Sequence, residues 1–293
     1  MKKIYLISIL FPLITISKSF CQSKIDMTEQ LINNTIKIEC AEKNMIKTGT
    51  GFFFNFQKDT LQCPVIITNK HVVEGSNDIK LFFKKSKDNK PQYEAPYIIP
   101  IDSSLIISHP NKNIDLVAIN ISPILNYFYS KNIDLYIKAS DESIILNDSL
   151  QKQKLNSIEN VIMIGYPNGL WDQKNNLPIV RNGITATSPF IDYNGKREFL
   201  IDIAAFGGSS GSPVYIYNSD PYIDKESNRL VITKNRFFLL GIMYSGPIYS
   251  IDGKVVKTSP NEPDINVKSG IPMNLGFVIK ATEILEFKKV IFK

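Results

Sequence analysis

Short strand-like runs recur at regular intervals along almost the whole chain. Each is a run of β-branched or aromatic residues, and polar turns separate one from the next. This pattern favours a β-barrel or sandwich over alternating strands and helices. The first set comprises Thr35–Cys40, Gly51–Phe56, Val65–Thr68, Ile79–Phe83, Tyr97–Ile101, Ser104–Ser108 and Leu116–Ile121. The second comprises Asn160–Ile164, Ile184–Ile191, Glu198–Ile203, Pro213–Tyr217, Phe237–Tyr244 and Leu275–Ile279. We therefore expect an all-β protein built from two β-barrels.

Two local signals refine this layout. Asn194-Gly195 lies between two strand-like runs and predicts a type I′ hairpin turn, in which both central residues have positive φ. The segment 126–159 is polar and carries a Ser-Asp-Glu-Ser cluster at 140–143. We place the linker between the two barrels there, so that the first barrel covers 22–125 and the second covers 160–293.

The run Gly-Gly-Ser-Ser-Gly-Ser-Pro at 207–213 carries the strongest functional signal. A serine hydroxyl becomes a good nucleophile only when a base takes its proton and donors receive the developing oxyanion. Small residues around Ser210 let the backbone turn sharply, so that the N–H groups of Gly208 and Ser210 converge. Taken alone, such a run is more often a turn or a linker. Ser209 is the rival nucleophile.

A base and an orienting acid are found upstream. The chain has only two histidines, and His71 follows the β-branched run that ends at Thr68. Asp115 enters an apolar strand, and a carboxylate buried there needs a polar partner. The imidazole of His71 can be that partner, which would hold the tautomer that accepts a proton from Ser210. A lone histidine is more often a satisfied surface or core residue than a catalyst, and Asp115 alone is equally consistent with a turn residue at the end of a strand.

Together these residues resemble the chymotrypsin-fold serine peptidases. The order His, Asp, Ser and the spacings are typical of that family. Gly49-Thr50-Gly51-Phe52 resembles the Gly-x-Gly-Phe strand of its bacterial branch, and Thr68–Val73 resembles the histidine segment of the high-temperature-requirement proteases. Ile164–Pro167 is similar to a segment that these proteases share with the glutamyl endopeptidases. The resemblance extends from about Thr35 to Phe287.

The resemblance implies a fold and a mechanism. The fold would be two antiparallel six-stranded β-barrels with the active site between them and a C-terminal helix over Ala281–Lys293. Ser210 would attack the scissile carbonyl, His71 would move the proton, and Asp115 would steady the imidazolium. Gly208 and Ser210 would form the oxyanion hole. The chain would then be an exported serine endopeptidase that acts on proteins or peptides through an acyl-enzyme, without a cofactor or a metal.

Specificity and activation follow the family's pattern only in part. Ala204 would line the primary pocket, and Tyr244, Ser245 and Gly246 would pair with the substrate backbone. No acidic residue stands at Ala204 and no pocket histidine is present, so we expect a small or medium apolar side chain before the cleaved bond. Digestive members have an Asp immediately before the nucleophile, which pairs with a newly cut N-terminus. Ser209 stands there instead, so a zymogen switch of that kind is not expected, nor is a PDZ domain after the second barrel.

The N-terminus reads as an export signal. Lys2 and Lys3 precede the mostly apolar run Ile4–Ile16, which is shorter than the roughly 20 residues that span a bilayer. We expect cleavage after Cys21, which gives a mature chain that starts at Gln22 and is periplasmic or secreted. Lipid attachment at Cys21 is the second choice, because Phe20 stands where a small residue is expected.

The charge pattern argues against a nucleic-acid partner, and the positions of the cysteines argue against a disulfide. The formal net charge is +6, but three of the lysines lie in the N-terminal segment, and the remaining charges form no stripe. Nucleic acid is therefore not an expected partner. Cys40 and Cys63 would lie on opposite edges of the first sheet, too far apart for a disulfide, so we expect two buried thiols.

Two alternatives to a peptidase remain open. One is a latent trypsin-like scaffold that acts as a binding protein. The other is an esterase that uses the same three residues. The sequence does not determine the oligomeric state.

Overall fold

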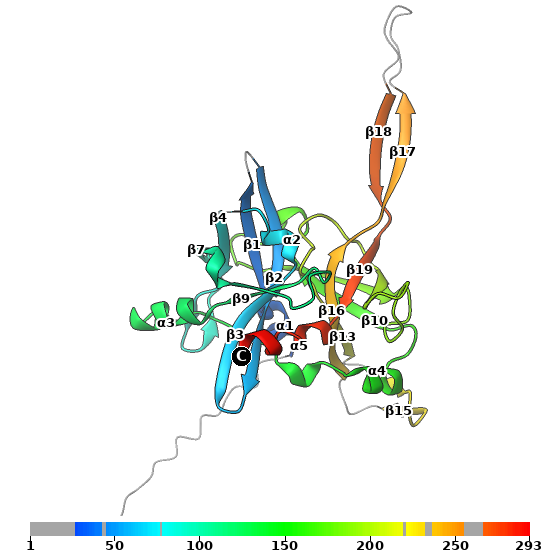
Figure 1. Ribbon diagram of the computed structural model, residues 1–293, viewed down its shortest axis with the longest axis horizontal. Helices are drawn as coiled ribbons and strands as arrows, with labels where there is room; N and C mark the ends of the chain where they lie inside the picture. Colours follow the sequence, from blue (N-terminus) through cyan, green and yellow to red (C-terminus); the bar gives the residue numbers. More distant parts are fainter. Residues whose placement is uncertain (1–26, 43–44, 77, 219–220, 232–235, 255–265) are drawn as a thin grey trace, which may run out of the picture.

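The structure is a computed structural model that describes residues 27–42, 45–76, 78–218, 221–231, 236–254 and 266–293. Two β-structures lie side by side, and the C-terminal helices α5 (Thr282–Leu285) and α6 (Lys288–Ile291) lie where they meet (Figure 1). The expected all-β fold of chymotrypsin type is confirmed.

The first half is a curled sheet of seven strands with the order β7-β4-β1-β2-β3-β9-β8. All of its strand pairs are antiparallel, and it differs from the expected six-stranded closed barrel because β7 and β8 at its two ends do not pair. The strands are β1 (Thr35–Glu42), β2 (Met45–Lys58), β3 (Leu61–Thr68), β4 (Asp78–Phe83), β7 (Tyr97–Ile101), β8 (Ile106–Ser108) and β9 (Val117–Asn120).

Side-chain alternation along β2 places apolar residues on both faces of this sheet. Phe52, Phe54 and Phe56 pack into the core that the two halves share, whereas Phe53 faces the interior of the first half. Each of these rings is almost fully buried. Burying aromatic side chains on both faces of one strand contributes a large share of the hydrophobic stabilisation, at about 25 cal/mol per Å² of apolar surface.

The second half is a closed antiparallel barrel with the order β10-β11-β12-β19-β16-β13. Its strands are β10 (Asn160–Gly165), β11 (Ile179–Thr185), β12 (Glu198–Asp202), β13 (Pro213–Asn218), β16 (Arg236–Ser245) and β19 (Leu275–Lys280). The strand predicted at Ile184–Ile191 is wrong in position, because β11 starts five residues earlier and ends at Thr185. The predicted turn at Asn194-Gly195 is confirmed: both residues have positive φ, 50° and 73°.

Shorter elements connect and decorate the two halves. Helices α1 (Met27–Asn34), α3 (Ser122–Ser130) and α4 (Asp148–Lys154) flank the sheets, and α4 with the turn η2 (Glu142–Ile144) lies in the segment predicted as a linker. The remaining small elements are α2 (Lys70–Val73), β5 (Ser86–Lys87), β6 (Lys90–Pro91), η1 (Ser103–Leu105), η3 (Pro167–Gly169), β14 (Tyr222–Asp224) and β15 (Arg229–Val231). Within the described parts of the chain, no helix has the length and apolar character needed to traverse a lipid bilayer.

A two-stranded ribbon projects from the second barrel (Figure 1). It consists of β17 (Ile248–Lys254) and β18 (Asn266–Pro272), which follow β16 and precede β19. The pairs Tyr249↔Ile271 and Gly253↔Val267 place apolar residues on one face of the ribbon, and Ile251 lies on the same face. The sequence analysis did not predict these strands.

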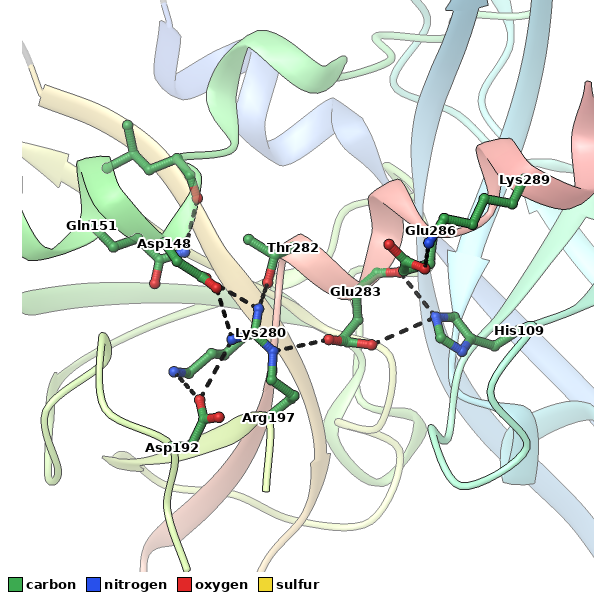
Figure 2. Close-up of polar contacts among 11 residues, drawn as sticks. His109, Asp148, Gln151, Asp192, Arg197, Lys280, Thr282, Glu283, Glu286 and Lys289 are labelled. Carbon is green, nitrogen blue, oxygen red and sulfur yellow. Dashed lines mark hydrogen bonds and ion pairs between the residues drawn. The ribbon is translucent and has the colours of Figure 1, made fainter. Parts of the chain in front are cut away.

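A shared core and a polar network join the two halves. The core contains Phe54 and Val65 from the first half, Tyr215 and Ile242 from the second, and Phe287 at the C-terminus. Figure 2 shows the polar network. Its members are His109, Asp148, Asp192, Arg197, Lys280, Thr282 and Glu283.

Glu283 of α5 connects the two halves within that network. Its carboxylate accepts a hydrogen bond from Arg197 Nε at 3.1 Å, and its backbone carbonyl lies 3.0 Å from His109 Nε2 (Figure 2). Arg197 belongs to the second half, and His109 precedes β9 of the first. His109 is thus a buried structural residue, which leaves His71 as the candidate base.

Both described cysteines are free thiols, as predicted, but the strands that carry them lie inside the sheet and not at its opposite edges as expected. Cys40 in β1 and Cys63 in β3 flank β2, which separates them. Cys40 is buried, and its burial raises the pKa of the thiol to about 11. Cys63 is half-buried rather than fully buried, a correction to the expectation.

Candidate active site

His71 and Asp115 are positioned by the end of β3 and the start of β9. β3 ends at Thr68, and the short helix α2 that follows carries His71 as its second residue. Asp115 lies just before β9, the neighbour of β3 in the sheet. The side-chain amide of Asn69 donates a hydrogen bond to the Asp115 carbonyl at 2.8 Å, which fixes the two segments against one another.

The two side chains form a close polar pair. His71 Nδ1 lies 2.6 Å from Asp115 Oδ2, and the His71 backbone N–H donates to Asp115 Oδ1 at 3.0 Å. Both oxygens of the carboxylate are therefore engaged by one residue, which orients the ring. The His71 side chain is 47% exposed, so the ring is open to solvent. The Asp115 side chain is 27% exposed, so it is partly buried rather than buried, a correction to the expectation.

Ser210 lies on a tight turn between β12 and β13. Gly208 and Gly211 on either side of it have φ values of +78° and +87°, which favour glycine. A Cβ atom at Gly211 would lie 1.8 Å from the carbonyl oxygen of Thr50, so no side chain fits there. The Ser210 hydroxyl donates to the Tyr244 carbonyl at 3.1 Å and makes no hydrogen bond to His71.

The N–H groups of Gly208 and Ser210 have no hydrogen-bond partner in the described part of the chain. Neither donates a hydrogen bond to any residue that the structure describes. The carbonyl of Gly207 accepts from the Asn168 N–H at 2.5 Å. Because a trans peptide points its C=O and its N–H in opposite directions, this contact turns the Gly208 N–H away from Asn168. Both N–H groups predicted to form the oxyanion hole are therefore unpaired within the described residues.

Thr50 of β2 holds this turn from the other half of the molecule. Its N–H donates to the Ser210 carbonyl at 2.9 Å, and its hydroxyl donates to the Gly208 carbonyl at 3.0 Å. The same hydroxyl accepts from the N–H of Tyr166 at 3.1 Å. The Thr50 carbonyl in turn accepts from the Thr68 hydroxyl at 2.7 Å, three residues before His71. Thr50 thus brings the Ser210 turn next to the end of the strand that leads to His71.

Replacing Thr50 with Val is expected to destabilise the protein and the turn. Valine keeps the volume and the β-branch, but it leaves the Gly208 carbonyl and the Tyr166 N–H without a partner. The expected loss is about 1–3 kcal/mol in the free energy of unfolding, measured by urea denaturation. Thr50→Ser keeps the hydroxyl and serves as the control. Equal stability of the Val and Ser variants would contradict the role assigned to the hydroxyl.

The structure also gathers the residues predicted to bind substrate. Tyr244 accepts the hydrogen bond from Ser210, and Ser245 and Gly246 follow it at the end of β16. A Cβ atom on Gly246 would lie 3.6 Å from the Ala205 Cβ, so this strand end borders the 204–205 segment. Ala204 is exposed.

Sequence reasoning missed three residues at the site. Thr50 was noted only as part of a motif, and neither Asn168 nor Arg181 was singled out. Asn168 has a positive φ of 48°, and the Asn-Gly pair at 168–169 was the available signal for a tight turn. For Arg181 the signal was a lone cation after the apolar pair Ile179-Val180. Among the described residues, no group of His, Cys, Asp and Glu side chains is arranged to hold a metal ion.

Comparison with known proteins identifies the class. The model of the trypsin-like peptidase domain family matches residues 49–219, more than half of the chain. The chain therefore belongs to the trypsin-like peptidase domain family. No curated protein sequence matches the chain.

Several solved structures resemble the chain at low identity. A serine endoprotease from Yersinia pestis has 16% identity and a TM-score of 0.47, and the match covers 90% of this chain and 66% of that one. An HtrA-type protease with a tripeptide has 16% identity and a TM-score of 0.47, covering 91% and 62%. The inactive form of a protease from M. tuberculosis H37Rv has 15% identity and a TM-score of 0.43, covering 90% and 88%. The chain thus spans just under two thirds of the first two of these proteins.

Proposed function

We propose that this chain is a serine endopeptidase that cleaves peptide bonds through an acyl-enzyme on Ser210. The observation that carries the proposal is the 2.6 Å contact between His71 Nδ1 and Asp115 Oδ2, which engages one ring nitrogen and leaves Nε2 as the nitrogen that could act as a base. A carboxylate on Nδ1 favours the tautomer with its proton on Nδ1. That tautomer presents an unprotonated Nε2 as the base.

The reaction begins with rotation of the Ser210 side chain. The hydroxyl leaves the Tyr244 carbonyl and turns to His71 Nε2, a change between staggered rotamers. Apo serine hydrolases often have such long or misaligned contacts before substrate binds. His71 then takes the hydroxyl proton as Ser210 Oγ bonds to the scissile carbonyl carbon, and the carbonyl oxygen becomes negative.

The free N–H groups of Gly208 and Ser210 receive this negative oxygen. Loss of one such donor costs about 3–4 kcal/mol of transition-state stabilisation in related chemistry. His71 gives the proton to the leaving amine when the peptide bond breaks, and the acyl group remains on Ser210. Water then attacks the ester with His71 again as base, which releases the acid and restores the hydroxyl.

A fluorophosphonate probe tests this assignment directly. The chain from Gln22 is incubated with the probe, digested, and mapped by mass spectrometry. The expected result is one adduct, on Ser210, that is absent in Ser210→Ala. An adduct on Ser209 would place the nucleophile one residue earlier. No adduct on any serine would favour the latent binding scaffold, and an adduct without peptide cleavage would favour the esterase.

The proposed primary pocket takes a small or medium apolar side chain. It is bordered by exposed Ala204 and by Gly246, and Ala204 brings no charge to attract Arg or Lys. Cleavage of a peptide library after Ala, Val or Leu is the expected pattern. Cleavage centred on Arg, Lys or Glu would refute it.

We further propose that the protein is exported and processed after Cys21. The signal-like segment 1–21 lies outside the described residues, so its support is the sequence pattern alone. N-terminal sequencing of the protein recovered from the periplasm or the medium should start at Gln22. Lipid on Cys21 would instead support the anchored form.

A further inference from the structure

Arg181 lies in β11 beyond the point where the pairing between β11 and β12 ends. β11 pairs with β12 at Ile184↔Asp202 and Thr185↔Ile201, and the ladder ends there. Continued in the same register, it would bring Arg181 opposite Ala205. The chain after Asp202 instead leaves the sheet and forms the segment 204–209, which leads into Ser210.

The Arg181 guanidinium contacts this segment near both of its ends. One terminal nitrogen donates to the carbonyl of Ala204, and the other donates to the Ser209 hydroxyl at 2.9 Å. The Ser209 oxygen also lies 3.4 Å from the Phe206 N–H, and the Ser209 N–H donates to the Phe206 carbonyl at 3.1 Å. The Ser209 side chain is fully buried. The cation therefore closes a small hydrogen-bonded loop whose next residue is Ser210.

Arg181 receives no compensation from a carboxylate. It forms no ion pair with any residue that the structure describes, and its Nε is buried without a hydrogen-bond partner. Burial lowers the pKa of Arg181 to about 10, which still leaves the guanidinium charged at neutral pH. Arg181 is half-buried, and even partial burial of an unpaired cation has a free-energy cost that an apolar side chain of similar size would avoid. The charged side chain makes hydrogen bonds to the 204–209 segment, which an apolar side chain could not make.

We propose that Arg181 is a positioning residue that holds the 204–209 segment so that the N–H groups of Gly208 and Ser210 face the substrate oxyanion. In this arrangement the oxyanion hole is positioned by the cation of Arg181 in β11, whereas in the digestive members a newly cut N-terminus has that role. The proposal rests on the proposed peptidase function. It adds that the enzyme needs no proteolytic activation of the digestive kind.

The test compares Arg181→Ala with the wild type and with Arg229→Ala, which removes an exposed arginine on β15. We expect kcat for a peptide substrate to fall about 100-fold in Arg181→Ala, the scale seen when one oxyanion donor is lost, with KM changed less than about threefold. Guanidinium ion at a few millimolar should restore part of the lost kcat, whereas sodium at equal ionic strength should not. Arg229→Ala should match the wild type.

Amide hydrogen exchange gives a readout that does not depend on activity. In Arg181→Ala, the peptide that covers 204–211 should exchange faster, while the peptides of β10 and β13 should keep their protection. Unchanged exchange in 204–211 would overturn the proposal, as would an unchanged kcat or a loss of kcat that guanidinium does not restore. If the wild type itself fails to react with the fluorophosphonate, the peptidase function fails. Hydrogen exchange then still decides whether Arg181 holds the segment.

Discussion

Ser210→Ala is expected to lower kcat/KM for a peptide substrate by about 10⁶-fold, the scale seen when a serine nucleophile is removed. Alanine removes only the oxygen that forms the acyl bond. The hydroxyl's one hydrogen bond, to the Tyr244 carbonyl, reaches a strand end that β16 already fixes, so the fold should be unchanged. Activity is measured with a quenched fluorescent peptide, and folding is checked by circular dichroism.

Ser212→Ala is the matched control. Ser212 is a buried serine two residues away, and its hydroxyl has no hydrogen-bond partner among the described residues. Its replacement should change kcat/KM by less than about twofold, because no polar contact is lost. Activity retained in Ser210→Ala at more than a thousandth of the wild-type value would mean that another residue attacks the substrate.

Asp115→Asn is expected to lower kcat by about 10⁴-fold while the protein stays folded. The carboxylate now accepts from both the ring nitrogen and the backbone N–H of His71. An amide can accept at one position, but its NH₂ group would face a donor at the other. The ring would then turn or adopt the tautomer whose proton lies on Nε2, and that tautomer cannot take a proton from Ser210.

Asp102→Asn controls for the general effect of losing a carboxylate. Asp102 is an exposed residue of the same half, and it caps η1 by accepting from the Ser104 N–H. Asparagine can make the same cap, so kcat should be unchanged. A loss below tenfold in Asp115→Asn would show that His71 does not depend on Asp115 for its orientation.

Most of the strands could be predicted from the sequence because they bury β-branched and aromatic residues. Tyr97–Ile101 is found with its predicted bounds, and β4 and β10 differ by one residue at one end. β11 was misplaced because its polar residues Arg181 and Asn182 and its Gly183 conceal the strand. The ribbon β17–β18 was missed because it packs on no core, so its alternation does not produce a buried face.

The part of the candidate site that could be predicted consists of residues whose side chains would carry out the chemistry. His71 and Asp115 could be paired because a carboxylate expected to be buried needs a donor, although Asp115 is only partly buried in the structure. Ser210 could be found from its small neighbours. The parts that escaped prediction act on backbone atoms. Thr50 and Asn168 bind peptide groups of the Ser210 turn, and Arg181 binds one carbonyl and one hydroxyl of the adjoining segment. Many residue types could make such contacts, so the residue type alone does not indicate them.

The position of Thr50 has a consequence for how this molecule could be divided. The strand that carries it belongs to one half, whereas the turn that it holds belongs to the other. A second barrel separated from the first would keep its own closed ladder, yet the carbonyls of Gly208 and Ser210 would lose their Thr50 partners. The proposed active conformation therefore depends on the contact between the halves. We expect a ligand that separated them to abolish the proposed activity without contacting Ser210.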